Sequence, residues 1–592
     1  MVFAEIKKHI ITAIETAIQT VWGPSAAEPP LQLKLEYPPR VEMGHFAVGC
    51  FPLAKSLRSA PAGIAAQIAA ACPADEIVES ISAAGPYLNI RLNAGVLFAT
   101  VCREIIAAGQ EFGDGDDGRG KRAMVEYLAP NTNKPLHLGH LRNGALGMAV
   151  ARMFAAKGYQ VVKANLVNDR GVHICKSMLA WERWGEGATP AEAGMKGDHF
   201  VGRWYVRYAR EADKDPSLEN DVQQMLRQWE AGHPATVDLW KMMNGWVYQG
   251  FEETYRNFGL DFDAVYYESN TYNLGKDIIQ KGLADQVFHR DDKGNIVFNL
   301  PEQDFGLEKN GQPKKVTVLR PDGTSLYVTQ DIATTVLKVR DHDLNFSIWV
   351  VGSEQEYHFK TLFRILVDLG YDWARMCYHL SYGMVYLPEG KMKSREGKIV
   401  DADDLIAEIK RLAEAEIRQR DPENQLTDAE VVQRAAVIGI GAIKFYLLRV
   451  RPTQSIHFDP AESISFDGFT GPYCQYAYAR ICGILAKAAD RGVDEDACDY
   501  GQLGNPEEVM LLQHLMQFPD EIAGAVADYN PAKVATHVFN TAKAFNQFYN
   551  KHQVLNARST QRVAARLQLI RTTAVVLKKG LHLLGVATLE NM

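Results

Sequence analysis

The spacing of apolar residues changes several times along the chain, and each spacing predicts a different kind of element. Short apolar runs at 124–128 and 346–352 predict buried strands, and a further strand is predicted at 160–166. After His140 the apolar residues recur every three to four positions, which predicts an amphipathic helix between the first two strands. A strand, a helix and a second strand at this spacing predict a parallel sheet with a right-handed crossover.

The rest of the pattern predicts further elements on both sides of this sheet. The stretch from about 171 to 303 is mainly helical and rich in tryptophan, and we expect these tryptophans in the core rather than on a base-stacking surface. Almost everything after 401 is helical. The predicted helices are 2–22, 46–57, 62–71, 406–420, 431–450, 471–489 and 531–552, and the further strands are 87–92, 315–319, 325–329 and 382–387.

Length and element order together predict several domains, because 592 residues are too many for one core. A charged, Gly- and Asp-rich stretch at 113–121 indicates a linker. The expected fold is multidomain, α/β plus all-α: a Rossmann-type parallel sheet, a small α+β N-terminal domain and a C-terminal helical bundle. The expected divisions are 1–112 for the N-terminal domain, 116–400 for the sheet domain with a helical insertion at about 171–303, 401–455 for a helical connecting segment and 456–592 for the bundle.

Candidate chemistry is concentrated in the turn after the first predicted strand. His137 and His140 lie three residues apart, so they share one face of the first helical turn, and Lys134 adds a positive charge. Gly139 leaves room for a flat base or a ribose. Free N–H groups and the helix dipole favour phosphate here, which predicts a nucleotide-triphosphate site. The alternatives are two solvated histidines or half of a metal site, for which no HExxH or CxxC partner is present.

A second candidate is the segment 390–398, which follows a predicted strand. It contains two glycines, and a flexible basic loop of this kind can close over a triphosphate. The alternative is an ordinary solvated loop. Its basic residues are Lys391, Lys393, Arg395 and Lys398.

Composition narrows the compartment and the type of partner. A net charge of -8 excludes a broadly basic nucleic-acid binder, so any RNA contact must use local basic patches. Eight scattered cysteines without a CxxC pair indicate free thiols in a reducing cytosol rather than a disulfide framework or a structural zinc. Charged residues interrupt the apolar N-terminus, so no signal peptide is expected. The sequence has no run of about 18 apolar residues, so no membrane span is expected either.

Four short motifs follow one another along the chain in a specific order. They are PNTNKP at 130–135, HLGH at 137–140, KMKSR at 391–395 and GPYCQYAYAR at 471–480. They resemble, in turn, the PNxxKP run, the HxGH element, a degenerate KMSKS loop and the start of the helical anticodon-binding domain of arginyl-tRNA synthetases, a family of class I aminoacyl-tRNA synthetases. HxGH alone is shared with other nucleotidyltransferases, whereas the ordered set is specific. The resemblance covers essentially the whole chain.

The resemblance implies a two-step reaction. The carboxylate of L-arginine attacks the α-phosphate of ATP, and a terminal ribose hydroxyl of the cognate tRNA then takes the arginyl group from arginyl-adenylate. Mg²⁺ accompanies ATP, and no protein-bound metal is expected. The family generally needs bound tRNA before the first step. We further expect a cytoplasmic monomer without a membrane partner.

The resemblance also implies roles for individual residues. For catalysis they are Lys134, His137, Gly139, His140, Lys391, Met392, Lys393 and Ser394, where Ser394 stands at the usual second lysine of the loop and Lys134 is thought to supply that charge. For arginine they are Glu126, Tyr327 and Asp331 around the guanidinium, with Asn131 and Gln355 at the amino and carboxylate end. For tRNA they are Tyr476, Tyr549 and Met592 at the anticodon loop, with Tyr87 and Asn89 at the D-loop.

Three alternatives remain at this point. A synthetase for cysteine would need a zinc site, which the scattered cysteines do not favour. A nucleotidyltransferase acting on a small molecule would not need the long helical C-terminal region. A non-catalytic RNA-binding relative would not need an intact set of His137, Gly139, His140, Asp331 and Gln355.

Overall fold

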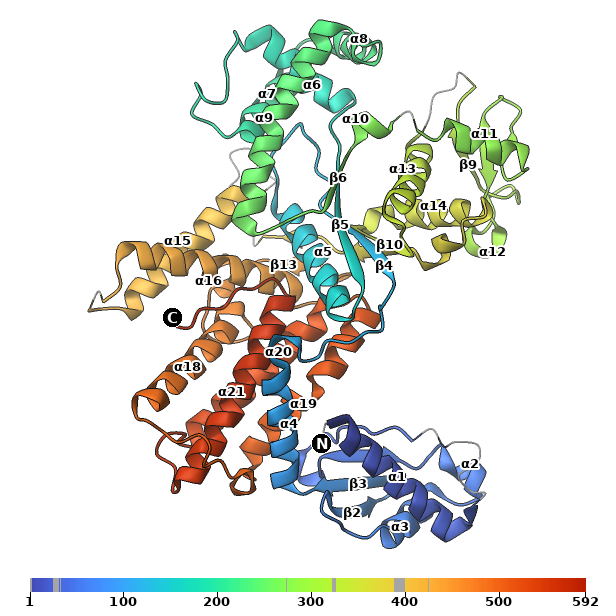
Figure 1. Cartoon of the computed structure of the whole chain (residues 1–592). Coiled ribbons are helices and arrows are strands. Elements are labelled where there is room, and N and C mark those ends of the chain that lie inside the picture. The colour runs from blue at the N-terminus through green and yellow to red at the C-terminus, as the bar shows by residue number, and fades with distance from the viewer. Residues whose placement is uncertain are drawn as a thin grey trace.

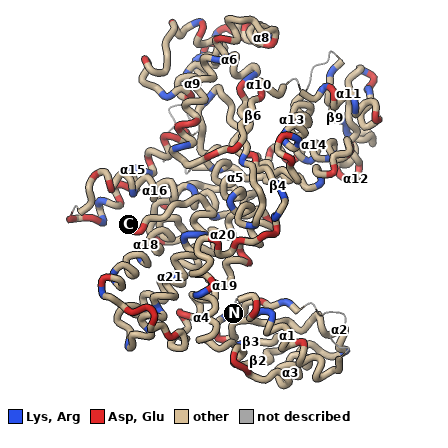
Figure 2. The backbone as a smooth tube through the Cα atoms, in the orientation of Figure 1, with Lys and Arg blue, Asp and Glu red and all other residues tan. Residues whose placement is uncertain are grey.

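The computed structural model of the chain places a five-stranded parallel sheet at its centre (Figure 1). One group of helices lies above the sheet in this view, a smaller α/β unit lies to its right, and the C-terminal helices and the N-terminal unit lie below. Basic and acidic residues are interspersed along every part of the chain (Figure 2), in line with the absence of a strong net charge. The structure describes residues 3–24, 31, 33–272, 274–321, 326–387, 400–423 and 425–592.

The N-terminal unit is an antiparallel sheet covered by helices, with strand order β1-β3-β2. The predicted helices at 2–22 and 62–71 and the strand at 87–92 are confirmed. The helix predicted for 46–57 is wrong in its first part, because residues 46–49 pair with β3 and only a short helix follows. Its elements are α1 (Phe3–Trp22), β1 (Phe46–Gly49), α2 (Leu53–Leu57), α3 (Pro61–Ala71), β2 (Val78–Ala84), β3 (Tyr87–Leu92) and α4 (Ala94–Ala108).

The central sheet has the order β11-β10-β4-β5-β6, and every neighbouring pair is parallel. Its middle strand β4 is buried on both faces, as continuous apolar runs predict. The strands predicted at 124–128, 160–166 and 346–352 and the helix after His140 are confirmed. The elements are β4 (Arg122–Glu126), α5 (Leu138–Ala156), β5 (Gln160–Val167), β6 (Ala264–Tyr267), β10 (Phe346–Gly352) and β11 (Tyr378–Tyr382).

Four helices between β5 and β6 form the upper group in Figure 1. Their tryptophans belong to the core, as expected: Trp204 is buried and Trp181 and Trp246 pack edge to face against neighbouring rings. The helical prediction for about 171–303 fails after residue 258, because β6 returns to the central sheet. The helices are α6 (Val172–Trp184), α7 (Gly197–Ala212), α8 (Leu218–Glu230) and α9 (Pro234–Phe258).

The unit at the right of Figure 1 has its own hydrophobic core and a three-stranded antiparallel sheet, β7-β8-β9. The strand predicted at 315–319 is β9, but it belongs to this small sheet and not to the parallel one. The strand predicted at 325–329 is wrong, because a helix begins at Tyr327 after Leu326 as its extended N-cap. The elements are α10 (Glu268–Thr271), α11 (Lys276–Ala284), β7 (His289–Arg290), β8 (Ile296–Asn299), α12 (Glu302–Phe305), β9 (Lys315–Leu319), α13 (Tyr327–His342) and α14 (Glu356–Asp368).

The region after residue 400 is helical, as predicted, and packs on α5 and on the N-terminal unit. The strand predicted at 382–387 is divided, since β11 ends at Tyr382 and β12 (Val385–Tyr386) pairs with β13 (Ile456–His457). Among the described residues, one helix, α16, is long and apolar enough to cross a membrane, and two thirds of its most apolar window is buried inside the protein. The helices are α15 (Ala402–Arg420), α16 (Asp428–Leu448), α17 (Pro460–Ser463), α18 (Gly471–Asp490), α19 (Pro506–Ala527), α20 (Pro531–Lys551) and α21 (Thr560–Leu583).

Candidate active site

The turn between β4 and α5 is held in a backbone conformation that residues other than glycine rarely adopt. Leu128 has φ 80° and Ala129 has φ 48°, which costs on the order of 1–3 kcal/mol per residue. The Leu128 N–H donates to Asn143 Oδ1 at 2.5 Å, and the Ala129 N–H donates to Asn165 Oδ1 at 3.2 Å. Asn143 in turn donates to the carbonyl of Val350 at 2.7 Å. Three elements of the fold thus hold this strained turn at the carboxyl end of the sheet, where α/β proteins bind ligands.

His137 and His140 cap the helix that follows this turn. His137 is the N-cap of α5, and its Nδ1 accepts the Gly139 N–H at 3.1 Å. His140 Nδ1 accepts the His137 N–H at 3.1 Å, and the ring centroids are 3.9 Å apart. Because both Nδ1 atoms act as acceptors, each neutral ring carries its proton on Nε2, which is free to donate. A Cβ on residue 139 would lie 3.0 Å from the His137 ring, so a side chain there would force this ring to shift.

The charge state of this group follows from its burial. Burial first, and then the charge of Lys134, lowers the pKa of His137 to about 4. Burial, His137 and Lys134 hold the pKa of His140 well below its ordinary value, and burial also lowers the pKa of Lys134. Both imidazoles are therefore neutral donors near pH 7. Together with the positive end of α5, these groups form a site suited to phosphate.

The basic loop expected to complete this site, with Lys391, Met392, Lys393 and Ser394, lies outside the described residues. Residues 400–402, which follow this loop, are described. Their backbone pairs with the start of residues 136–140, which we call the signature turn. The Leu138 N–H donates to the Val400 carbonyl at 3.0 Å, and the Ala402 N–H donates to the Leu136 carbonyl at 3.0 Å. A short antiparallel bridge therefore joins residues 136–138 to residues 400–402.

The acids predicted to surround a guanidinium lie at the end of β4 and on α13. Glu126 is buried and forms an ion pair with Lys338, which is 2% exposed. Asp331 pairs with His358 at 2.6 Å, and Tyr327 is 79% exposed. Asp331 and Lys338 are two helical turns apart, about 10 Å along one face of α13. Asp331 and the partner of Glu126, Lys338, therefore lie on the same face of this helix. Asp331 and Glu126 thus lie on the same side of the sheet.

The residues predicted for the amino and carboxylate end of arginine lie on exposed connections. Asn131 is exposed and forms a bridge with Asn168, in the loop after β5. Gln355 is exposed at the end of a short 3₁₀ helix (Ser353–Gln355) that follows β10. Both positions are at the carboxyl ends of parallel strands, where side chains can reach a common ligand.

Sequence reasoning did not find Lys338 or His358. The available signal for Lys338 was its place two helical turns after Asp331 on the same face, but its partner depends on how α13 packs against β4. His358 follows the strand end that carries Gln355, which was the available signal for that residue.

Of the predicted anticodon residues, Tyr476 lies on α18, Tyr549 lies on α20, and Met592 follows the last helix. The Arg480 guanidinium lies over the Tyr476 ring at 4.7 Å and over the Tyr549 ring at 5.4 Å, and it donates to the Tyr476 hydroxyl at 3.1 Å. Phe466 contacts the Tyr476 ring, and Met592 packs against the same small hydrophobic cluster as Phe466. The fold thus brings these three predicted residues into one region.

The predicted D-loop residues lie on strand β3 of the N-terminal unit. Tyr87 is 40% exposed and contacts Phe51, which is also exposed. Asn89 is buried, and its Oδ1 has no hydrogen-bond partner among the described residues. Since side chains two apart in a strand share a face, Tyr87 and Asn89 lie on the same side of this sheet.

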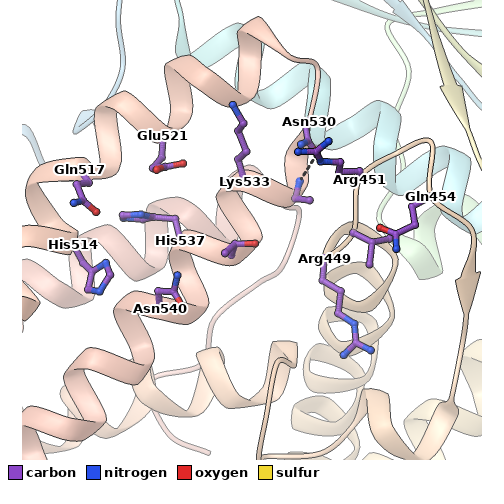
Figure 3. Close-up of a pocket in the computed structure, with 13 residues that line it drawn as sticks. Arg449, Arg451, Gln454, His514, Gln517, Glu521, Asn530, Lys533, His537 and Asn540 are labelled. Atoms are coloured by element: carbon purple, nitrogen blue, oxygen red, sulfur yellow. Dashed lines mark hydrogen bonds between the residues drawn. The ribbon is translucent and has the colours of Figure 1, made fainter. Parts of the chain in front are cut away.

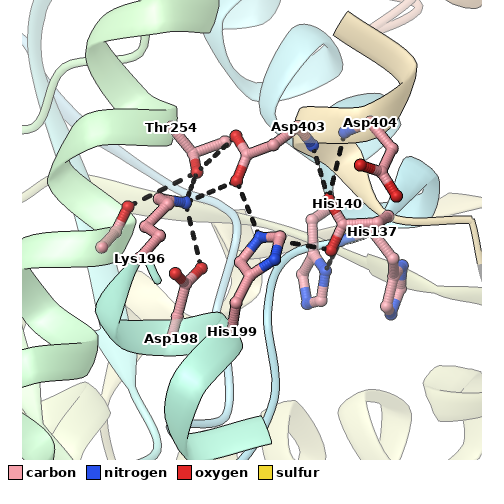
Figure 4. A network of polar contacts seen from close by, with 10 residues as sticks. His137, His140, Lys196, Asp198, His199, Thr254, Asp403 and Asp404 are labelled. Atoms are coloured by element: carbon pink, nitrogen blue, oxygen red, sulfur yellow. Dashed lines mark hydrogen bonds and ion pairs between the residues drawn. The ribbon is translucent and has the colours of Figure 1, made fainter. Parts of the chain in front are cut away.

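Two other polar groups could hold a small ligand. Asp198, His199 and Asp403 lie close enough to share a cation, but Lys196 already places its ammonium 3.1 Å from Asp198 and 2.5 Å from Asp403 (Figure 4). A cavity of about 420 Å³ lies between the end of α16 and helices α19 and α20 (Figure 3). None of the residues predicted from the sequence lines this cavity, and its Arg449 and Lys533 are paired with Glu462 and Asp528.

Comparison with known proteins gives matches along the whole chain. Residues 4–92 match the family described as Arginyl tRNA synthetase N terminal domain, 103–459 match tRNA synthetases class I (R), catalytic domain, and 474–592 match DALR anticodon binding domain. The arginine–tRNA ligase of Treponema denticola is 43% identical over 95% of both chains, and that of Treponema pallidum is 40% identical over 99% of both. The arginyl-tRNA synthetase structure from Thermus thermophilus superposes with a TM-score of 0.78 at 28% identity, covering 99% of this chain and all of that one.

Proposed function

Because this chain belongs to the arginyl-tRNA synthetases of class I, we propose the following account of how it ligates L-arginine to the 3′ end of its cognate tRNA. The reaction has two steps through arginyl-adenylate, consumes ATP and releases AMP and pyrophosphate. The observation that supports it most directly is the near-complete coverage by relatives of one activity, from the N-terminal unit to the anticodon-binding region.

In the first step, a carboxylate oxygen of arginine forms a bond to the α-phosphorus of ATP, and the bond to pyrophosphate breaks. No side-chain nucleophile is needed, so positioning and charge neutralisation supply the rate enhancement. The Nε2–H groups of His137 and His140 donate to the phosphates, Lys134 supplies a cation, and Gly139 keeps the backbone accessible. Mg²⁺ arrives with ATP as part of the substrate. We assign the same task to Lys391, Met392, Lys393 and Ser394, which lie outside the described residues.

Arginine binds at the edge of the sheet with its guanidinium toward the acids. Glu126 and Asp331 supply the negative charge, and the exposed ring of Tyr327 supplies a flat partner for the planar group. Asn131 and Gln355, at neighbouring strand ends, bind the amino and carboxylate groups and aim the carboxylate at ATP. Since Glu126 is held by Lys338, its position is fixed before arginine arrives.

The tRNA is held at two places away from this site. Tyr476 and Tyr549, kept together by Arg480, present aromatic surface to unstacked anticodon bases, and Met592 completes the apolar part of that surface. The exposed Tyr87 faces the D-loop, and we assign Asn89, which is buried on the same side of β3, to the same contact. We propose the same domain limits as above: 1–112 for the N-terminal contact, 116–400 for catalysis, 401–455 as a connection and 456–592 for the anticodon.

We further propose that the chain works as a cytoplasmic monomer without a resident metal or a membrane partner. All eight cysteines are free in the described structure, which fits a reducing compartment. The long apolar helix α16 is mostly buried, as in the core of a water-exposed protein. The ammonium of Lys196 already occupies the space between the carboxylates of Asp198 and Asp403, where a metal would bind.

An aminoacylation assay tests the assignment. The purified chain is incubated with ATP, Mg²⁺, unfractionated tRNA and each of the twenty amino acids in turn. We expect charging with arginine alone, and pyrophosphate release that depends on both arginine and tRNA. Charging with another amino acid, or none with arginine, would overturn the proposal.

A further inference from the structure

A buried polar cluster connects the helical insertion to the segment that follows the basic loop (Figure 4). The carboxylate of Asp403, in the first turn of α15, accepts from Lys196 Nζ at 2.5 Å, from His199 Nε2 at 3.1 Å and from Thr254 Oγ1 at 3.0 Å. Lys196 and His199 belong to the start of α7, and Thr254 belongs to α9. Asp403 is therefore attached to two helices of the insertion at once.

The same short segment is attached to the signature turn on its other side. Val400 and Ala402 exchange backbone hydrogen bonds with Leu138 and Leu136, and His137 lies opposite Asp401. Asp401 caps α15 by accepting the Asp403 N–H at 2.8 Å, so the position of one acid fixes the other. Any shift of residues 400–403 would be passed to the backbone that orients the His137 ring.

The cluster is only partly exposed to water. The side chain of Asp198 is fully buried, and those of Lys196 and Asp403 are 14% and 24% exposed. Burial alone would raise the pKa of Asp403, yet the hydrogen bonds from His199 and Lys196 hold it at about 2. A Cβ on Gly250 would lie 2.4 Å from Asp198 Oδ1, so α9 approaches the cluster closely at a glycine.

We propose that Asp403 is a positioning residue for adenylate formation. Lys196, His199 and Thr254 hold Asp403 against the insertion. Through residues 400–402, Asp403 then fixes the backbone of the His137–His140 turn. The inference rests on the proposed role of that turn in binding ATP. It gives the insertion helices a direct mechanical connection to the ATP site. Asp403 itself touches no substrate in this account, and it acts through the backbone bonds of Val400 and Ala402.

The test compares Asp403→Asn with a matched variant elsewhere. Asp114 pairs with the buried Lys579 at 2.6 Å, and the two side chains are 33% and 8% exposed, so Asp114→Asn removes the same charge from a similar pair that does not contact residues 400–403. Steady-state aminoacylation is measured with ATP, arginine and tRNA varied in turn, together with thermal unfolding of each variant. The activity of the unaltered chain is established first, so failure of the proposed function itself would be recognised separately.

We expect Asp403→Asn to raise KM for ATP about tenfold, since small displacements of groups that position a substrate have effects of this order, and to change KM for arginine and tRNA less than twofold. Asp114→Asn should lower the unfolding temperature without changing any KM. His199→Gln removes one outer contact of the cluster and should raise KM for ATP about threefold, with the same small effects on arginine and tRNA. This variant replaces Asp403→Asn in the test if Asp403→Asn fails to fold. An unchanged KM for ATP in the folded Asp403 or His199 variant, or equal effects on all three substrates, would overturn the proposal.

Discussion

The ammonium of Lys338 forms an ion pair with the carboxylate of Glu126, and both side chains are almost completely buried. The pair joins α13, the helix that carries Asp331, to the end of the central strand β4. Removing one partner of such a pair leaves the other charge uncompensated in the interior, which costs about 3–5 kcal/mol. The geometry of the proposed guanidinium pocket therefore depends on a lysine that does not itself bind arginine.

We expect Lys338→Met to raise KM for arginine about tenfold or more near pH 7. Without the ion pair to Lys338, the carboxylate of Glu126 is no longer held in place at the end of β4, so the proposed pocket loses its geometry. Arginine KM measures the effect, and Lys338→Arg, which keeps a cation at the position, is the control. A wild-type arginine KM in Lys338→Met would contradict the dependence.

Replacing Asp331 should separate arginine use from ATP binding. Asp331→Asn removes a charge from the proposed pocket and leaves the phosphate site intact, and a charge-assisted hydrogen bond is worth about 1.5–3 kcal/mol. We expect KM for arginine to rise roughly 10- to 100-fold, with KM for ATP changed less than twofold. Asp341→Asn, ten residues further along α13 beside Arg340, is the matched control. Equal losses for both substrates would count against the assignment.

His45 should make the N-terminal unit sensitive to acid. Its Nδ1 accepts the Leu92 N–H at 3.0 Å, and burial, with the charge of Arg91, lowers its pKa to about 4. Because the ordinary pKa is about 6.5, the unfolded chain takes up the proton first as the pH falls, and stability is lost between about pH 6.5 and pH 4. We expect His45 alone to cost roughly 2 kcal/mol between pH 7 and pH 5.

Chemical unfolding at pH 7 and pH 5 measures this loss. His45→Asn keeps an oxygen that can accept from Leu92 but does not titrate, so its stability should fall less with acid than that of the unaltered chain. The same slope in both proteins would show that His45 does not titrate differently on unfolding.

Arg480 should matter for tRNA alone. Its guanidinium holds the rings of Tyr476 and Tyr549 together, and stacking of an unpaired base on an aromatic ring is worth about 1–3 kcal/mol. We expect Arg480→Ala to raise KM for tRNA about tenfold, with KM for ATP and arginine unaffected. Arg491→Ala, at the end of the same helix, removes an exposed arginine that bonds only to Asn556 among the described residues and is the control. The assignment fails if tRNA KM is the same in both variants.

Local periodicity was sufficient for the elements that build the phosphate site. Strands β4 and β10 are buried on both faces, and such strands read as apolar runs whatever their partners are. β5 is mostly half-buried and was predicted from its spacing after the helix. Local periodicity failed where a partner decides the conformation. Residues 46–49 are a strand because β3 lies beside them. β6 was missed because its apolar run is only four residues long, and no residue in it is fully buried.

The contacts around the site could not be derived from the sequence in the same way. HLGH indicated a helix start and a phosphate site, yet the use of both Nδ1 atoms as backbone acceptors depends on ring orientation. Lys338 and Glu126 are far apart in the chain, and their pairing requires the packing of α13 on the sheet. Lys196, Thr254 and Asp403 come from three helices, so no local pattern connects them.

The strand order of the central sheet affects how the chain folds while it is being synthesised. β4 is synthesised first among the five strands, but β10, its neighbour on one side, leaves the ribosome only after residue 346 has been added. At about 5–20 residues per second, the nascent chain exposes one edge of β4 for roughly 10–45 seconds while the insertion helices are already able to form. An open edge of this kind can pair with other chains, so translation speed and chaperone capacity should limit the yield of this protein in a foreign host.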